Sequence, residues 1–340
     1  MLTEKAGQRA CRDKSAIEYD HYLSLDWSLK IMAIAHMSRR DQVPRVFERP
    51  ADLKELKAYL RSLKGRVILT FEESGFAHWL YLELLDEVDR MIICDPFKNK
   101  LLHHGPKTDK IDARKLCELL RAGLLIEVYH STSGLYELRL LVSAYDDVVR
   151  SGIRVLNQQA ALKLGHRDKG KTATFINGVL TKNIELYRKS KEEYEQRFRD
   201  IARRNTLVRF QRRLAGIGTI GAVKIVACVV DARRFPYTGK YFSYCGLISH
   251  EKLSGGRSYG RRKPRYSRML KSVYKTAALA AINGKNSFRD YYDYLLNSGV
   301  AEHNARHAVA RYIARISYGM LKTGTRYEPY RWRNAQEKST

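Results

Sequence analysis

The stretch RVILTFEES, residues 66–74, decides the fold of the first third of the chain. It is β-branched and apolar with hardly a break over residues 67–71, which is typical of a strand that is covered on both faces. Two acidic residues, Glu72 and Glu73, follow where this strand ends. Because a buried strand needs helices on both faces of its sheet, the neighbouring sequence should alternate strands and helices.

The sequence on either side of this strand has that alternation. HYLSLDWS (21–28) and KIMAIAHMS (30–38) predict two adjacent strands joined by a tight turn, RMIICDP (90–96) a third buried strand, and LLIEVYH (124–130) a last short one. Amphipathic helices are predicted at 51–65, 76–88 and 109–123, the first and last stopped by glycines. Residues 15–130 are therefore predicted to form a mostly parallel α/β sheet with helices on its faces.

The rest of the chain predicts helices. Residues 131–205 hold two long charged helical patterns separated by the Gly- and Lys-rich break HRDKGKTAT, residues 166–174. They predict a helical hairpin, a dimerising coiled coil or an arm, and a plain helical spacer fits equally well. Residues 206–330 predict a third, mainly helical domain.

The charge of the chain points to a polyanionic partner. Among 340 residues, 63 Lys and Arg stand against 36 Asp and Glu, for a formal net charge of +27. Nucleic acid is the partner that such an excess favours. An anionic membrane is the rival, but no apolar run approaches the roughly 18 residues of a spanning helix. The five cysteines form no CxxC pair, and the first residues lack an apolar signal core, so a cytoplasmic protein is expected.

Four carboxylates are predicted to meet at one edge of the sheet. Asp26 lies at the end of the first strand, Glu72 ends the buried strand, and Asp109 and Asp112 enter the helix within KTDKIDA, residues 107–113. Four like charges repel, and hard Mg²⁺ or Mn²⁺ ions would neutralise them and could clamp a phosphoryl transfer. This order of acids is typical of RNase H-like, RuvC-like nucleases. The alternative is that Asp109 and Asp112 only cap their helix and complement its dipole.

Two further segments could contact phosphates. LAGIGTIGAVKIVA, residues 214–227, has the helix-hairpin-helix pattern, in which Gly216 and Gly218 would let backbone amides approach a phosphate. An ordinary glycine-rich turn is the alternative. SGGRSYGRRKPRYSR, residues 254–268, predicts a phosphate-facing loop whose cations are Arg257, Arg261, Arg262, Lys263, Arg265 and Arg268. Ser254 precedes two glycines there, as a turn residue or as a nucleophile, and no general base for it is visible.

As a set, these motifs resemble the DEDD transposases of the insertion sequence one-ten family, whose relatives include the Piv site-specific DNA invertases. LSLDWS, FEESG and KTDKIDA carry the resemblance in the first half, and LAGIGTIGAVKIVA, RRFPYTGKYFSYCGLIS, KLSGG and MLKSVYKTAALAAI carry it in the second. The likeness runs from about residue 20 to residue 328. FEESG departs from the family's usual Glu-Ala-Thr-Gly, so Glu73 competes with Glu72, and strand alternation favours Glu72.

The resemblance implies a specific reaction and specific partners. The first domain would be RuvC-like with Asp26, Glu72, Asp109 and Asp112 as metal ligands, and Ser254 would form a phosphoserine link with DNA. Members act as homo-oligomers, from dimers to tetramers, guided by a noncoding bridge RNA that pairs with donor and target DNA. Two alternatives remain from the residues themselves: a nucleic-acid-binding protein that does not recombine DNA, and a RuvC-like nuclease that hydrolyses without rejoining.

Overall fold

The computed structural model describes residues 18–98, 108–165, 170–262 and 264–329. These residues form two compact units that divide between Thr132 and Ser133. The helical segment predicted over 131–205 shares the second unit with residues 206–329. We describe each unit by itself.

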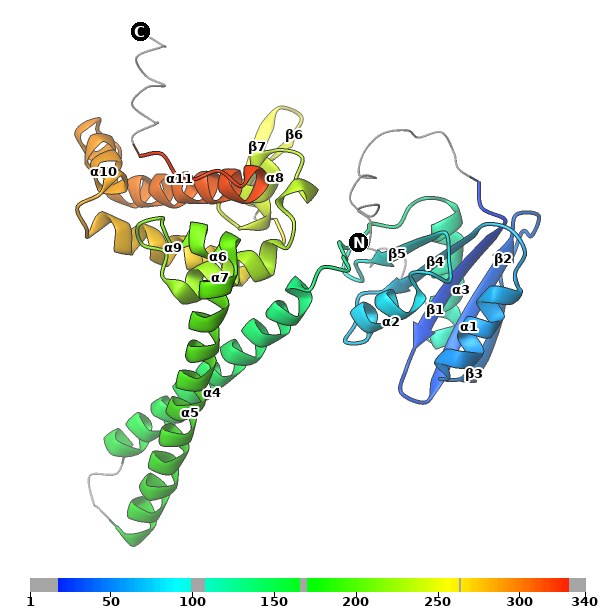
Figure 1. Ribbon diagram of the computed structural model, residues 1–340, viewed down its shortest axis with the longest axis horizontal. Helices are drawn as coiled ribbons and strands as arrows, with labels where there is room; N and C mark the ends of the chain where they lie inside the picture. The colour runs from blue at the N-terminus through cyan, green and yellow to red at the C-terminus, as the bar shows by residue number, and fades with distance from the viewer. Residues whose placement is uncertain (1–17, 99–107, 166–169, 263, 330–340) are drawn as a thin grey trace. The chain divides into compact units, whose positions relative to one another are not determined.

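The first unit is built on a five-stranded mixed sheet (Figure 1). Its strands are β1 (His21–Trp27), β2 (Ile31–Ser38), β3 (Arg45–Pro50), β4 (Val67–Glu72) and β5 (Arg90–Cys94), in the spatial order β3-β2-β1-β4-β5. β1 pairs antiparallel with β2 and parallel with β4, β2 pairs antiparallel with β3, and β4 pairs parallel with β5. The carboxyl ends of β1, β4 and β5 therefore share one edge of the sheet.

Helices cover both faces of this sheet (Figure 1). α1 (Leu53–Ser62) and α2 (Ala77–Leu84) lie on one face, over a core that includes Leu23, Leu69 and Phe71. α1 begins where the Asp52 carboxylate accepts a 2.8 Å hydrogen bond from the amide of Lys54, as an N-cap does. α3 (Asp109–Arg121) covers the other face, against β1 and β2. The alternation predicted from the sequence thus produces a sheet buried on both sides.

Two predictions for this unit are wrong in detail, and one strand was missed. The sheet is mixed, not mostly parallel, because β2 and β3 run against β1. β3 was not expected, since RVFERP is an edge strand with exposed residues and a terminal proline, and therefore lacks an apolar run. Residues 124–130 make only an isolated antiparallel bridge, Glu127 to Cys94, in place of the predicted strand.

The second unit begins with a long helical hairpin (Figure 1). α4 (Leu135–Gly165) and α5 (Lys171–Arg204) pack along each other. Their bases join the core of the unit through Val142 and Tyr145 of α4 and Phe198 of α5. The predicted break is shorter than expected, because its last four residues, 171–174, are already helical, and residues 166–169 lie outside the described part.

The remaining residues form a helical domain around a buried helix. Its helices are α6 (Thr206–Gln211), α7 (Thr219–Val229), α8 (Thr238–Tyr244), α9 (Arg268–Ile282), α10 (Ser287–Asn297) and α11 (Glu302–Thr323), with a 3₁₀ turn, η2 (Ala232–Arg234). α7 is mostly apolar and contributes seven buried residues to the core, while its one charged side chain, Lys224, pairs with Asp146 of α4. A buried chain of hydrogen bonds links Tyr241, Tyr274, Ser317 and Gln211, and so ties four helices together.

An exposed two-stranded ribbon, β6 (His250–Ser254) and β7 (Arg257–Arg262), stands on this helical domain. Residues 254–268 were predicted to form a loop, and the hairpin corrects that prediction. Two consecutive glycines with positive φ, Gly255 at 55° and Gly256 at 75°, make the tight turn. Positive φ at both central residues is what a two-residue hairpin turn requires, so the double glycine has a structural cause.

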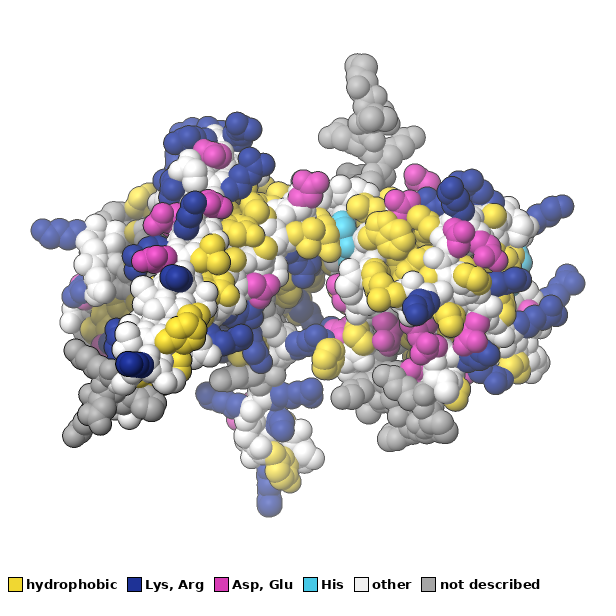
Figure 2. All heavy atoms as spheres, turned by 90° about the horizontal axis from the view of Figure 1, so that it is seen from below, with side chains coloured by type: hydrophobic (Ala, Val, Ile, Leu, Met, Phe, Trp, Pro, Cys, Tyr) yellow, Lys and Arg dark blue, Asp and Glu magenta, His cyan; other side chains and the backbone are white. Residues whose placement is uncertain are grey.

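The excess positive charge belongs almost entirely to the second unit. Residues 1–132 carry 22 Lys and Arg against 20 Asp and Glu, a net charge of +2, whereas residues 133–340 carry 41 against 16, a net charge of +25. On the face that Figure 2 shows, Lys and Arg side chains project from both units, and several acidic side chains gather on the sheet unit at the right. The described helices include none long and apolar enough to cross a membrane.

Candidate functional site

The register of the parallel strands places Asp26 beside Glu72. β1 and β4 pair with Ser24 opposite Thr70, and two residues further along each strand come Asp26 and Glu72. Side chains two apart on a strand point to the same face, so both carboxylates share the face of Ser24 and Thr70. Both residues are half-buried at the carboxyl edge of the sheet.

Helix α3 crosses that same face and runs against the direction of β1. The Ser24 hydroxyl donates a hydrogen bond to the carbonyl of Ala113, and the Cys117 thiol donates one to the carbonyl of Tyr22, with an S–O distance of 3.3 Å. Moving forward along α3 therefore means moving backward along β1. The amino end of α3 consequently lies toward the carboxyl edge, on the side of Asp26.

Asp109 and Asp112 lie in the first turn of α3, on the side of the helix that faces the sheet further along. Asp109 is four residues before Ala113, and Asp112 is four residues before Leu116; both of these apolar residues are buried. Residues four apart lie on the same side of a helix, so the two carboxylates continue the sheet-facing side beyond its apolar part. The cap itself is Thr108, whose hydroxyl accepts a 3.3 Å hydrogen bond from the Ile111 amide. Neither aspartate is the N-cap residue.

Glu73 is committed to a different contact. Its Oε2 lies 2.5 Å from Nε2 of His130, which is nearly fully buried. The His130 ring stacks on His78 of α2, with ring centroids 5.6 Å apart and planes 25° apart. The contact between Glu73 and His130 therefore connects the segment after α3 to the end of β4. The sequence analysis missed His130, because nothing in LLIEVYH marks a buried partner for a glutamate 57 residues earlier.

The acids share an edge without forming a closed metal cage. In the described ranges no group of three or more Asp, Glu, His or Cys side chains stands close enough to hold a metal ion. Asp109 is exposed on the first turn of α3, directly after the undescribed residues 99–107. The structure thus brings Asp26, Glu72, Asp109 and Asp112 to one edge and one face, and their use as ligands stays a prediction.

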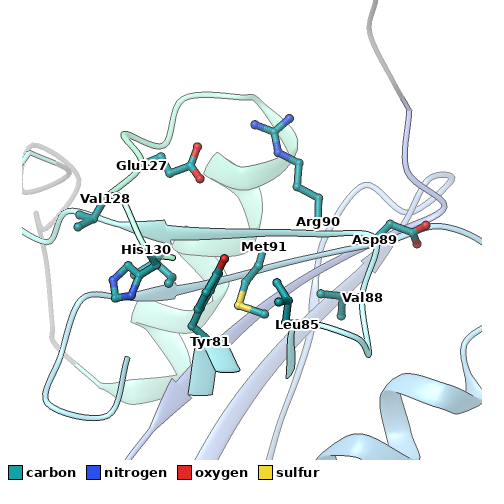
Figure 3. Close-up of a pocket in the computed structure, with 10 residues that line it drawn as sticks. Tyr81, Leu85, Val88, Asp89, Arg90, Met91, Glu127, Val128 and His130 are labelled. Carbon is teal, nitrogen blue, oxygen red and sulfur yellow. The ribbon is translucent and has the colours of Figure 1, made fainter. Parts of the chain in front are cut away.

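A separate pocket in the same unit does not include these acids. It has a volume of about 160 Å³ and is lined by residues of α2, β5 and the segment around residue 128, including Tyr81, Met91, Glu127 and His130 (Figure 3). The Tyr81 and His130 rings lie side by side, with centroids 5.5 Å apart. Burial raises the pKa of the Glu127 carboxyl, while Arg90 and His130 act in the opposite direction.

Ser254 lies at the tip of the ribbon. It ends β6, is exposed, and pairs with Arg257 across the turn. His250 begins the same strand, four residues away, which corresponds to about 13 Å along a strand and is too far for a direct hydrogen bond. The serine is thus accessible and next to a cation, and its role as a nucleophile stays a prediction.

The predicted phosphate contacts fall on the ribbon and on the segment that leads to α9. Arg257, Arg261 and Arg262 lie on β7, Arg265 and Arg268 are exposed in or after the following segment, and Lys263 lies outside the described residues. Tyr259, also on β7, is 68% exposed. The ribbon therefore presents several cations and one aromatic ring on a thin projecting element.

The two glycines of the helix-hairpin-helix pattern differ in what they do. Gly216 has φ +83°, and a Cβ there would stand 2.0 Å from the carbonyl oxygen of Ala277 on α9. Gly218 has ordinary φ, −78°, is the N-cap residue of α7, and has open space where a Cβ would be. Gly216 is therefore required for packing, whereas Gly218 has room for a side chain, and contact of either backbone with a phosphate stays a prediction.

Gly216→Ala is expected to destabilise the protein, and Gly218→Ala to do so far less. The first variant combines a left-handed backbone with a clash against backbone atoms, for a loss of at least about 2 kcal/mol. The second loses a good N-cap residue, which costs about 1 kcal/mol or less. Chemical denaturation of both variants measures the difference. Equal losses would contradict the separate roles.

Two comparisons with known proteins agree with this arrangement. Residues 25–164 match the transposase family DEDD_Tnp_IS110, and residues 210–293 match the Transposase IS116/IS110/IS902 family. A 43.6 kDa uncharacterised protein of insertion element IS110 from Streptomyces coelicolor is 32% identical over 116 residues. That match covers 34% of this chain and 29% of the relative, so the chain spans less than a third of the relative's length. The two family matches cover the acidic edge and the core of the helical domain, and the chain belongs to the IS110 family of transposases.

Proposed function

We propose that this chain is a DNA recombinase that cuts and rejoins the DNA of an insertion sequence. The observation that carries the proposal is the common edge of the sheet unit, where β1, β4 and α3 bring Asp26, Glu72 and Asp112 to one face. That arrangement supports a RuvC-like domain. The +25 charge of the other unit supports binding of the polyanionic substrate.

Mg²⁺ or Mn²⁺ would be held by Asp26, Glu72, Asp109 and Asp112. The donor set is composed of carboxylate oxygens, which hard divalent cations prefer. When bound, such an ion neutralises the acids and polarises a phosphate. The protein's own contribution is to hold Asp26 and Glu72 on neighbouring strands, so that rigid backbone fixes their spacing.

Ser254 is the proposed nucleophile. Its Oγ would form a bond to phosphorus while the bond from phosphorus to a sugar oxygen breaks. The serine gives up its proton and the departing sugar oxygen takes one up, so no nucleotide is consumed. Attack by a sugar hydroxyl on the phosphoserine reverses these steps and rejoins the strand. The exposed position of Ser254 beside Arg257 supports access to a phosphate.

A noncoding bridge RNA and further copies of the chain are the proposed partners besides donor and target DNA. The +25 charge of the second unit suits a large structured RNA as well as DNA, because both are polyanions. On the helical hairpin, several apolar side chains are exposed, which supports assembly of a homo-oligomer, from dimer to tetramer, through a coiled coil. They are Ile153, Leu156 and Leu164 on α4 and Phe175, Val179 and Leu186 on α5.

A RuvC-like nuclease that hydrolyses DNA without rejoining it is the second candidate. One observation favours it. The hairpin turn alone explains the two glycines after Ser254, so they are not evidence that Ser254 is a nucleophile. The two candidates differ in whether a protein–DNA link forms. A nucleic-acid-binding protein without either activity would retain the ribbon but tolerate loss of the acids.

Binding to nucleic acid is expected to depend steeply on salt. Each phosphate that a cation neutralises releases condensed counterions and contributes about 0.9 to the slope of log K against log salt for duplex DNA. With six or more contacts from the second unit, the slope should be about −5 or steeper. Fluorescence anisotropy across a salt series measures it. A flat plot for both DNA and RNA would remove nucleic acid as the main partner.

A further inference from the structure

A second basic surface lies on the second unit, outside the ribbon. Along α11, every fourth residue from 303 to 315 is His or Arg, namely His303, His307, Arg311 and Arg315. Twelve residues of helix extend about 18 Å, which is the axial rise of about five nucleotides of one duplex strand. Residues four apart follow one side of a helix, so these side chains form a continuous row.

Helix α9 brings more cations to the same place. α9 and α11 pack side by side (Figure 1). Lys271 and Lys275 of α9 lie close enough to His307 to act on its charge, as do His303 and Arg311 of α11. Burial lowers the pKa of His307 most, and these four neighbours lower it further. All four neighbours are basic residues. The surface, defined as Lys271, Lys275, His303, His307 and Arg311, has no acid among the groups that act on His307.

Lys275 and Arg311 of this surface differ from other cations of the same domain. Arg306, next to His307 in the sequence, is paired with Glu302, and Arg289 on α10 is paired with Asp293 at 2.7 Å. In the described part of the chain, no carboxylate pairs with Lys275 or Arg311, and both are exposed. Uncompensated cations placed together repel one another, and a bound polyanion relieves this repulsion.

We propose that the α9–α11 surface binds the sugar-phosphate backbone of a nucleic acid, separately from the ribbon. The row extends about 18 Å along α11, and the cations Lys271, Lys275 and Arg311 gather around His307. These features fit a repeating backbone of phosphates better than a folded protein. The inference rests on the proposed function, because it assumes that the chain handles nucleic acid, and it adds a defined contact surface.

The test is the salt dependence of binding by the full-length double variant Lys275→Gln/Arg311→Gln. Two probes are used, a 30-base-pair DNA duplex and an RNA hairpin of unrelated sequence. Loss of two phosphate contacts should reduce the steepness of log K against log salt by about 2. A reduction with only one probe assigns the surface to that nucleic acid, and a reduction with both assigns it to the shared backbone.

The matched control is Arg289→Gln/Arg306→Gln, which removes the same net charge from the same domain but takes cations that already have carboxylate partners. Its slope should stay within about 0.5 of the wild-type slope. Thermal melting of both double variants checks that they are folded. Equal slopes for the two double variants would overturn the inference. Polyglutamate serves as a polyanion without phosphates, and an effect of Lys275→Gln/Arg311→Gln on polyglutamate binding alone would overturn it too. Failure of the wild-type chain to bind either probe would overturn the proposed function as well.

Discussion

Asp112→Asn should reduce strand cleavage and joining by about a thousandfold or more, while the protein stays folded. The substitution keeps the shape of the side chain and removes the charge that a divalent cation requires. Stabilisation of transition-state charge by a metal contributes several kcal/mol, and each 1.4 kcal/mol corresponds to a factor of ten in rate. The half-buried position of Asp112 on the sheet-facing side of α3 is the structural reason to expect this loss.

Glu72→Gln and Glu73→Gln form the matched pair for this prediction. They are neighbours in the sequence and change charge equally, but Glu72 follows Thr70 on the face of Asp26, whereas Glu73 contacts His130. Only Glu72→Gln should abolish activity. A second readout is the rise in melting temperature with added Mn²⁺, which Glu72→Gln should lose and Glu73→Gln should keep. Normal activity of Asp112→Asn, or loss of the Mn²⁺ effect in Glu73→Gln alone, would refute this assignment of the acids.

The acidic edge could be predicted because it follows from rules that act locally. A buried strand ends where its apolar run ends, so Asp26 and Glu72 had to lie at strand ends. Parallel pairing of β1 and β4 then brings those ends to one edge. The direction of α3 was not readable from the sequence, since it depends on contacts such as Ser24 with Ala113, 89 residues apart.

The ribbon and the two glycines show where local rules fail. Residues 250–262 are exposed and mostly polar, so their sequence lacks the alternation that marks a half-buried strand. The hairpin was signalled only by the two glycines, which also suit a loop. Gly216 and Gly218 look alike in the sequence, but Ala277 of α9, about sixty residues later, makes one of them necessary for packing. Long-range packing of this kind decides the role of a glycine.

The net charge of the chain is concentrated in the second unit. The +27 of the whole chain favours a polyanionic partner, and the division of the chain into two units places +25 of it in one of them. The sheet unit, which holds the acidic edge, is nearly neutral, with a net charge of +2. In the proposed function, the metal-binding acids lie on the sheet unit, whereas Ser254 and most of the excess cations lie on the second unit.

Ser254→Ala should abolish covalent attachment to DNA and leave binding unchanged. Without the hydroxyl, no phosphoserine can form, and loss of a nucleophile reduces turnover on the order of 10⁴-fold or more. Because Ser254 is exposed at the end of β6 and alanine suits that position, the ribbon should keep its fold. A labelled DNA substrate that stays with the protein on a denaturing gel reports the link directly, and anisotropy reports the binding.

Ser258→Ala is the control for Ser254→Ala. Ser258 is exposed on the opposite strand of the same ribbon, where it pairs with Leu253. It has the same chemistry, and the proposal gives it no part in the reaction, so its variant should form the adduct at the wild-type level. If Ser254→Ala still cuts and rejoins DNA at the wild-type rate, the acids carry out the reaction without it. If the Ser254→Ala variant cuts DNA and neither it nor the wild-type protein forms an adduct, the chain hydrolyses DNA as a nuclease. The two glycines after Ser254 would then serve only to form the turn of the ribbon.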